Sequence, residues 1–227
     1  MRNIIRKAVL VTAAATAIGL LNVASGAGAF AHDPAGTAND PRLVPFRSVG
    51  DTATVGFKSS PVGDAPGSPQ PRALRLSTFE DTGIAYAGVD PVNVAINGQA
   101  IADVNRLGFK TRGYNGAGAP RISVELSNGH IAYLASFHCN TVLSPTVWRK
   151  TQFTSDATGC TIFTNTTSYA STGTSSAWDQ LVAGEGGGVT IDDIYLVQDE
   201  GPAIAWVDDL RFGGVMFSGP DIRTHSH

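Results

Sequence analysis

The chain has 227 residues, of which 42% are hydrophobic and 15% are charged, and its formal net charge at pH 7 is −3. A chain of this length can form one domain that buries roughly 70% of its unfolded surface. Because acidic residues outnumber Lys and Arg, the composition lacks the basic excess of a nucleic-acid-binding protein. An anionic membrane surface is disfavoured for the same reason.

The first 31 residues are typical of a secretory signal peptide. Three basic residues precede an apolar run from Ala8 to Leu21, and small residues follow it up to Ala31. The run is shorter than the roughly 18 to 20 apolar residues of a transmembrane helix, and no later stretch approaches that length. Cleavage after Ala31 leaves 227 − 31 = 196 residues and a net charge of −3 − 3 = −6. We expect a secreted, extracellular protein without a transmembrane span.

The rest of the chain alternates short β-branched and aromatic runs with Pro/Gly turns, which predicts an all-β sandwich over residues 46–218. Residues 32–45 lack periodicity and predict a loose arm, and residues 219–227 predict a flexible tail. One short helix is expected over Ala177–Ala183, capped by Ser175 or Ser176 and ended by Gly184. The expected strands are Thr52–Lys58, Ala73–Thr78, Val92–Ile96, Arg106–Thr111, Arg121–Leu126, His130–Phe137, Trp148–Phe153, Thr161–Thr164, Thr190–Gln198 and Ala203–Phe212.

The last two expected strands form a closing pair, and each carries an Asp-Asp pair: Asp192-Asp193 and Asp208-Asp209. On a regular strand one Asp of each pair faces inward, where an unpaired carboxylate is costly. Three interpretations remain open: a hydrogen-bonded Asp, a hard-cation site or a catalytic pair. Calcium takes oxygen ligands, so Asp208 and Asp209 are the candidate ligands of a structural calcium ion.

Cys139 and Cys160 are the two cysteines of the chain. In an exported protein an even count favours a disulfide bond over a thiol nucleophile. His138 is adjacent to Cys139, and strand alternation would point the two side chains to opposite faces. We therefore predict that Cys139 and Cys160 are bonded, with a stabilisation of roughly 3 kcal/mol.

No catalytic motif accounts for the remaining polar residues. The paired-carboxylate pattern Glu-x-Asp-x-x-Glu is absent, and Glu125 and Glu185 have no same-face companion on their own strands. A β-elimination lyase would need a Tyr or His base with an Arg that neutralises a uronate. The residues that offer this chemistry are Tyr133, His130, His138 and Arg121.

Aromatic rings that stack on sugars, with amide or carboxylate groups nearby, are the expected basis of glycan binding. Tyr114 is the first candidate, because it lies with Asn115 in a glycine-rich loop that cannot easily bury a ring. Tyr86 and Trp178 are further candidates for ligand binding. Trp148 and Trp206 lie in apolar surroundings and are expected in the core.

Three stretches give the chain a resemblance to a known type of domain: Gly56 to Ser77, Leu107 to Val124 and Trp178 to Asp209. They resemble the secreted bacterial jelly-roll domains of the carbohydrate-binding-module and galactose-binding-like type. The resemblance implies a two-sheet β-sandwich, often non-catalytic, that frequently binds glycans and sometimes holds a structural calcium ion.

We therefore expect an all-β, two-sheet antiparallel β-sandwich of jelly-roll type with at most one short helix. As a function we expect a non-catalytic, monomeric module that binds an extracellular or cell-wall polysaccharide or a cell-surface glycan, and not nucleic acid. Two alternatives stay open: a polysaccharide lyase or glycoside hydrolase with an unrecognised site, and a structural or protein-interaction protein of the envelope. No cofactor is required other than the calcium ion considered above.

Overall fold

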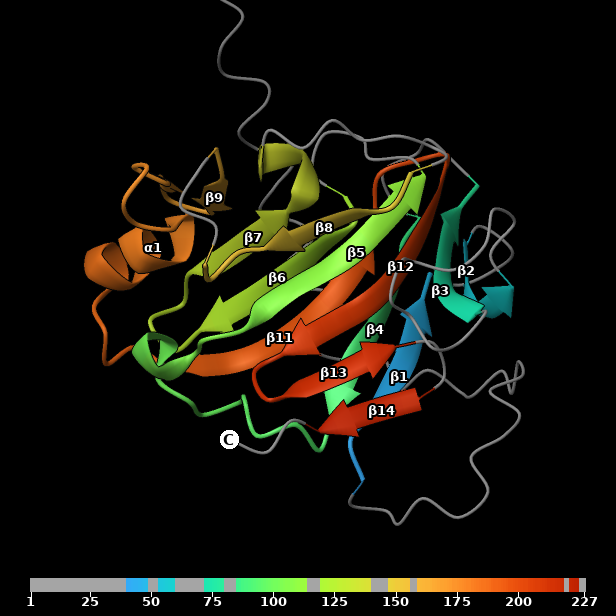
Figure 1. Ribbon diagram of the computed structural model, residues 1–227, viewed down its shortest axis with the longest axis horizontal. Helices are drawn as coiled ribbons and strands as arrows, with labels where there is room; N and C mark the ends of the chain where they lie inside the picture. The colour runs from blue at the N-terminus through green and yellow to red at the C-terminus, as the bar shows by residue number, and fades with distance from the viewer. Residues whose placement is uncertain are drawn as a thin grey trace, which may run out of the picture. The chain divides into compact units, whose positions relative to one another are not determined.

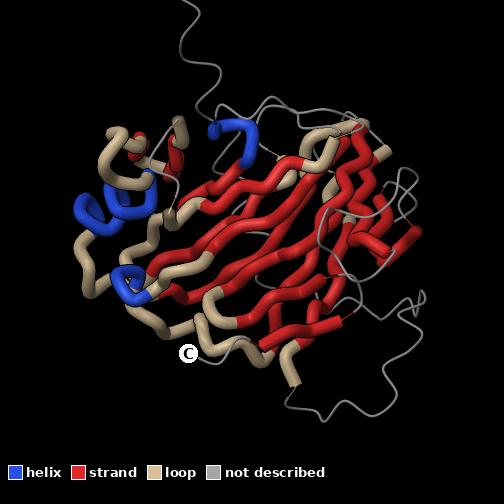
Figure 2. Tube along the Cα trace, in the orientation of Figure 1, coloured by secondary structure: helices blue, strands red, loops and turns tan. Residues whose placement is uncertain are grey.

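Two antiparallel sheets of seven strands each make up the described part of the chain, and this confirms the expected two-sheet sandwich. The computed structural model describes residues 40–48, 53–59, 72–79, 85–113, 119–139, 147–155, 159–218 and 221–224. Figures 1 and 2 show how strands dominate this part, with helix α1 at one side. The order of strands in the first sheet, sheet A, is β1-β4-β11-β6-β7-β9-β10. In the second, sheet B, β12 lies between β5 on one side and β3 and β13 on the other, with β8, β2 and β14 outside them.

The bounds of the strands follow. Sheet A contains β1 (Arg42–Arg47), β4 (Ala87–Val92), β6 (Arg121–Leu126), β7 (Ile131–Ala135), β9 (Thr161–Thr164), β10 (Ser168–Ala170) and β11 (Ile191–Gln198). Sheet B contains β2 (Ala53–Ser59), β3 (Arg72–Thr78), β5 (Leu107–Gly113), β8 (Arg149–Gln152), β12 (Ala203–Phe212), β13 (Val215–Ser218) and β14 (Asp221–Thr224).

The core lies between the sheets and follows from alternation along each strand. In β6 the side chains of Ile122, Val124 and Leu126 are buried in the core, whereas the residues between them point away from sheet B. Strand β12 supplies Val207 and Phe212 to the same core from the opposite sheet. Each sheet therefore has an inner apolar face and an outer face on which polar and aromatic residues gather.

Helix α1 spans Ala177–Glu185, which confirms the expected short helix but not its end, because the helix continues through Gly184. Ser176 caps it, because its side chain accepts a hydrogen bond from the backbone N–H of Asp179 and the Asp179 carboxylate accepts one from the backbone N–H of Ser176. The helix packs on β9 and β10, and Gly186 follows its last residue. Short 3-10 helices, η2 (Ile101–Asp103) and η3 (Ser136–Cys139), complete the described helical structure.

Some expected elements differ from the observed ones. The strand expected over Val92–Ile96 is wrong, because β4 ends at Val92 and Asn93 adopts a left-handed φ of 59°. Strand β1 occupies part of the expected arm, since an edge strand tolerates proline and Pro45 pairs with Val89. Strands β10, β13 and β14 were not expected. The two strands expected as a closing pair do not pair with each other: β11 belongs to sheet A and β12 to sheet B.

Candidate binding face on sheet A

The outer face of sheet A carries a row of hydroxyl and aromatic side chains on neighbouring strands. Ser123 points outward from β6, because its neighbours in the strand lie in the core. It pairs with Tyr195 of β11 on one side and with Tyr133 of β7 on the other, and Tyr133 pairs with Phe163 of β9. We call these four residues the sheet A row. Three strand spacings give it a length of about 14 Å, enough to lie under more than one sugar ring.

One end of the sheet A row is an exposed aromatic cluster. Phe163 is 42% exposed, and the ring of His138 meets it at a centroid distance of 4.6 Å in an edge-to-face arrangement. The ring of Phe137, 52% exposed, lies 5.8 Å from that of His138. Burial, with a smaller effect of the Arg121 charge, lowers the pKa of His138, so that the ring is neutral at pH 7. Phe163, His138 and Phe137 thus offer uncharged ring surface.

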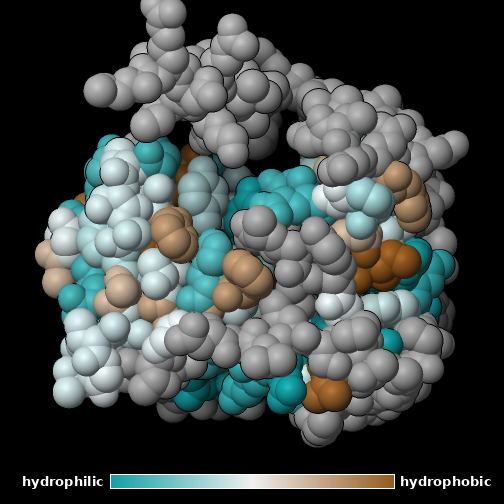
Figure 3. Space-filling view, turned by 90° about the horizontal axis from the view of Figure 1, so that it is seen from above, coloured by the Kyte–Doolittle hydropathy of each residue, from teal (hydrophilic) through white to brown (hydrophobic). Residues whose placement is uncertain are grey.

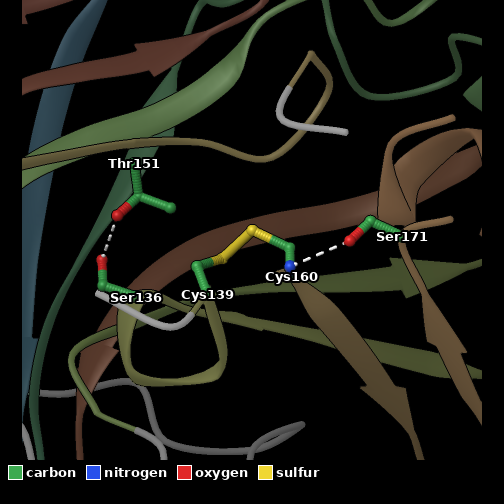
Figure 4. Close-up of a disulfide and its surroundings, with 5 residues drawn as sticks. All are labelled: Ser136, Cys139, Thr151, Cys160 and Ser171. Carbon is green, nitrogen blue, oxygen red and sulfur yellow. Dashed lines mark hydrogen bonds between the residues drawn. A yellow bond between two sulfur atoms is a disulfide. The ribbon is translucent and has the colours of Figure 1, made fainter. Parts of the chain in front are cut away.

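A disulfide holds this cluster together. Cys139 and Cys160 are bonded, with their Cα atoms 3.7 Å apart, which confirms the predicted pairing (Figure 4). The bond links the end of η3, which carries Phe137 and His138, to the residue before β9, which carries Phe163. Hydrogen bonds support both ends of the bond. Thr151 Oγ1 donates to Ser136 Oγ at 2.8 Å, and the backbone N–H of Cys160 donates to Ser171 Oγ at 3.0 Å.

The other end of the row is also aromatic. The ring of Phe46 on edge strand β1 meets Tyr195 at 5.9 Å, edge to face, and lies 6.2 Å from Tyr86. Phe46 pairs with Gly88 of β4, and a Cβ atom at Gly88 would overlap its ring. A glycine is therefore needed at position 88 for the Phe46 ring to lie across β4.

Carboxylates flank the row with shifted pKa values. Burial, followed by the charge of Asp193, raises the pKa of Asp90 to about 7. Burial also raises the pKa of Glu125, together with the charges of Asp193 and Asp192, although a hydrogen bond with Tyr195 opposes the shift. Burial and then the Glu125 charge raise the pKa of Tyr195 to about 12. The face thus holds acceptors and, near pH 7, a carboxyl that is partly protonated.

Arg121 also lies on this face, but the carboxylate of Asp199 neutralises its charge. Its Nη1 donates to Asp199 Oδ1 at 2.6 Å, and its Nη2 donates to Asp199 Oδ2. The guanidinium also lies over the ring of Tyr133, 5.2 Å from the centroid. Burial raises the pKa of Tyr133 despite this cation. Arg121 therefore fixes the Tyr133 ring, while its two amino groups are occupied by a carboxylate of the chain itself.

The structure places the residues that were expected to bind a ligand in different surroundings. Tyr114 and Asn115 lie outside the described residues. Tyr86 is half-buried at the edge of the outer face of sheet A, against Phe46. Trp178 is 2% exposed, and its Nε1 donates to the carbonyl of Ile101 at 3.1 Å. Trp178 therefore belongs to the core rather than to a binding surface, because α1 turns its apolar side onto the sheets.

Asp208 and Asp209 lie on sheet B with protein partners. Asp208 Oδ1 accepts hydrogen bonds from Ser218 Oγ at 3.3 Å and from the backbone N–H of Asp209 at 2.8 Å. Lys110 Nζ lies 2.6 Å from Asp209 Oδ2. Among the described residues no group of three or more His, Cys, Asp or Glu side chains is suited to hold a metal ion. Calcium binding stays a prediction, which a change in melting temperature with millimolar calcium, compared with chelator, would test.

Three of the four residues considered for a lyase lie near one another, because the Arg121 guanidinium covers the Tyr133 ring and its charge also acts on His138. Tyr133 and Arg121 are in contact, but His130 lies elsewhere, with its Nδ1 2.7 Å from Glu185 Oε2. Tyr169 Oη also donates to Glu185, at 2.7 Å. His130 and Glu185 thus serve to hold α1 against β7 and β10 rather than to face the sheet A row.

The sequence indicated no partner for Glu125, and the structure shows one across the strands. Glu125 of β6 pairs directly with Asp193 of β11. Sequence reasoning also missed Phe163, Tyr195 and Asp90. Alternation within Arg121–Leu126 and Ile191–Gln198 could have placed several of these residues on one outer face. Their contact depends on strand order, which short-range patterns do not carry.

No protein-family model, curated protein or solved structure matches this chain. Over the described residues, no helix is long and apolar enough to cross a membrane. The functional assignment therefore depends on the geometry of the outer faces.

Proposed function

We propose that the outer face of sheet A binds an extracellular polysaccharide without cleaving it. The observation that carries this proposal is the sheet A row, in which two tyrosines, a serine and an exposed phenylalanine lie on four neighbouring strands. Sugar rings present C–H groups that stack on aromatic rings and hydroxyls that pair with polar groups. The three aromatic residues of the row and the flanking carboxylates offer both kinds of contact over about 14 Å, whereas Ser123 is only 1% exposed.

The charge on this face favours a neutral glycan over a polyuronate. Asp90, Glu125 and Asp193 are acidic, and the charge of Arg121 is neutralised by Asp199. A lyase needs a free cation to bind the uronate carboxylate, and Arg121 is not available for this role. Among the described residues visible in Figure 3, hydrophobic residues are scattered among hydrophilic ones.

Retention on insoluble neutral polysaccharides tests this proposal. Tyr133→Ala and Phe163→Ala should each weaken retention about 5-fold, because losing one stacked ring costs about 1 kcal/mol. Phe79→Ala is the matched control, since Phe79 is 47% exposed but follows β3 of sheet B. If Phe79→Ala weakens retention as much as the two row variants, or if no neutral glycan retains the wild type, the proposal is wrong.

A hydrolase acting on the same face is the second candidate. The observation that favours it is the pKa of Asp90, about 7, which would let this carboxyl donate a proton near neutral pH. Asp193 or Glu125 would then have to be the second carboxylate. Release of reducing ends from a neutral polysaccharide, lost in Asp90→Asn, would establish this activity and overturn the non-catalytic assignment.

A further inference from the structure

The outer face of sheet B collects basic side chains from five strands. Arg75 and Arg211 each lie between residues of the core, so alternation points them to the opposite side of the sandwich from the sheet A row, and the strand register places the others on the same face. None of these positions forms a basic run in the sequence, apart from Arg149-Lys150. Among the described residues the set is Lys58 of β2, Arg75 of β3, Lys110 and Arg112 of β5, Lys150 of β8 and Arg211 of β12.

The carboxylates on this face offset only part of the charge. Asp209 pairs with Lys110, and Asp208 accepts hydrogen bonds from neutral donors. Both are largely buried, at 9% and 3% exposure. Within the described ranges, no ion pair involves the other five basic residues of the face. Among the described residues of this face, six basic side chains therefore stand against the carboxylates of Asp208 and Asp209, although the whole chain is acidic.

A row of alternating arginine and tryptophan crosses this face. Trp206 of β12 pairs with Arg75 on one side and Arg112 on the other, and each guanidinium carbon lies 6.0 Å from its ring centroid. Arg112 also lies over Trp148, at 5.6 Å. The prediction that Trp206 is a core residue needs correction: the ring is buried, but under arginines on the outer face rather than between the sheets.

Arg112 is a charged donor without an acceptor. It is 3% exposed, and neither Nε nor Nη1 has a hydrogen-bond partner. Arginine stays charged in proteins, so unmet donors in a desolvated guanidinium are costly. A carboxylate oxygen pair matches the fork of a guanidinium. Arg112 is too buried for a large ligand to reach, so the accessible cations of this face are Lys58, Arg75, Lys150 and Arg211.

We propose that the outer face of sheet B binds a carboxylated polysaccharide, whose uronate groups accept hydrogen bonds from Arg75 and Lys150. Lys58 and Arg211 flank these residues and attract the next carboxylates along the chain. This site is independent of the sheet A row, since the two faces point away from each other and differ in charge.

The structure favours a polysaccharide over a nucleic acid. The faces of Trp206 and Trp148 are covered by guanidinium groups, so they offer no bare platform for base stacking. The net charge of −3 also gives no long-range field that would concentrate a duplex at the protein.

Binding to polygalacturonate and to its highly methyl-esterified form tests the proposal by titration calorimetry. The free acid should bind at low ionic strength and lose affinity as salt is added, because screening weakens contacts between exposed charges. The methyl ester, with neutral groups in the same polymer, should bind more weakly and without a dependence on salt, because it can engage only the sheet A row. Equal affinity for the two forms, or no binding of the free acid at low salt, would overturn the proposal.

Charge-reversal variants locate the site. Lys150→Glu should weaken binding of polygalacturonate about 5-fold or more, whereas Arg42→Glu, the same charge change on exposed edge strand β1 of sheet A, should change it less than about 2-fold. Arg75→Lys keeps the charge but loses the fork, and should also weaken binding while circular dichroism stays unchanged. Equal effects of Lys150→Glu and Arg42→Glu, or wild-type affinity in Arg75→Lys, would contradict the assigned site.

Two further binding measurements distinguish this proposal from the alternatives. Tyr133→Ala should leave polygalacturonate binding intact, even where it weakens retention on neutral glycans, because it changes only the sheet A row. Loss of both activities in Tyr133→Ala would mean one shared site and would overturn the independent one. A DNA duplex that binds more tightly than polygalacturonate at the same salt would instead assign the face to nucleic acid.

Discussion

Asp90 has a carboxyl that is more basic in the folded protein than in the unfolded chain. Its pKa rises from 3.8 to about 7, through burial and the neighbouring Asp193. Between about pH 4 and pH 7 the folded protein keeps a proton that the unfolded chain releases, so stability falls as pH rises. Asp90→Asn removes this penalty. We expect the variant to be more stable than wild type by about 1 to 2 kcal/mol at pH 8, after allowing for solvent screening.

Urea unfolding of Asp90→Asn and wild type at pH 8 and at pH 4 measures this effect. The difference should shrink at pH 4, where Asp90 stays protonated in the folded protein and is about half protonated in the unfolded chain. A stability difference that does not depend on pH would mean that the substitution acts through packing and that the shift is not real.

Gly88 shows how one missing side chain shapes the sheet A face. An added Cβ would overlap the Phe46 ring and would lie 2.5 Å from the carbonyl oxygen of Leu196. Gly88→Ala should therefore destabilise the protein by about 1 to 3 kcal/mol, because the backbone of β11 cannot move aside cheaply. Gly56→Ala on β2 is the control, since the nearest atom to its new Cβ would be Lys58 Cε at 4.0 Å. Similar losses in both variants would show that glycine flexibility, not crowding, is responsible.

At the scale of elements, helix α1 is fixed to the sheet through Glu185. Its carboxylate accepts hydrogen bonds from Tyr169 Oη at 2.7 Å, Asn128 Nδ2 at 2.8 Å and His130 Nδ1 at 2.7 Å. Burial opposes its ionisation, but these hydrogen bonds leave the pKa of Glu185 below its usual value. The stabilisation is present above about pH 4.5 and is lost as pH falls through the lower folded-state pKa.

Glu185→Gln should cost about 2 kcal/mol at pH 7, and the difference from wild type should shrink below pH 4. Chemical unfolding over this pH range measures it. Glu125→Gln is a matched control of opposite sign, because the pKa of Glu125 is raised, chiefly by burial, and neutralising it should not destabilise the protein. Equal losses at pH 7 and pH 3.5 in Glu185→Gln would contradict the ionic role.

The disulfide joins η3 to β9 and therefore couples stability to the aromatic cluster. The two cysteines are separated by 21 positions, and closing such a loop contributes roughly 3 kcal/mol. Reduction should lower the melting temperature and weaken glycan retention, because Phe137 and His138 are no longer tied beside Phe163. The double variant Cys139→Ser and Cys160→Ser should behave like the reduced protein and should not respond to reductant. Full retention after complete reduction would show that the cluster does not need the bond.

For the whole molecule, the two outer faces differ in charge although the overall charge is small. The sheet A face holds Asp90, Glu125 and Asp193, and the sheet B face holds lysines and arginines on five strands. The net charge of −3 does not reveal this separation. A sandwich presents two independent surfaces to solvent, so one domain can bind two chemically different polymers.

Much of the architecture was predictable because it depends on local patterns. Strands Arg121–Leu126, Thr161–Thr164 and Ala203–Phe212 have their expected bounds, since alternation and flanking turns define them. The helix followed from the Ser176 cap and a glycine near its end. The disulfide followed from the even number of cysteines in a chain that is expected to be exported.

The candidate sites were not predictable in the same way, because they combine residues from strands far apart in the sequence. Ser123 lies between Tyr195 and Tyr133 only because β11 and β7 flank β6. Strand order depends on the long-range packing of the two sheets, which no short-range pattern contains. The sequence by itself determined the fold class, the helix and the covalent bond. Tertiary structure alone decided which side chains meet on each outer face, and therefore what each face can bind.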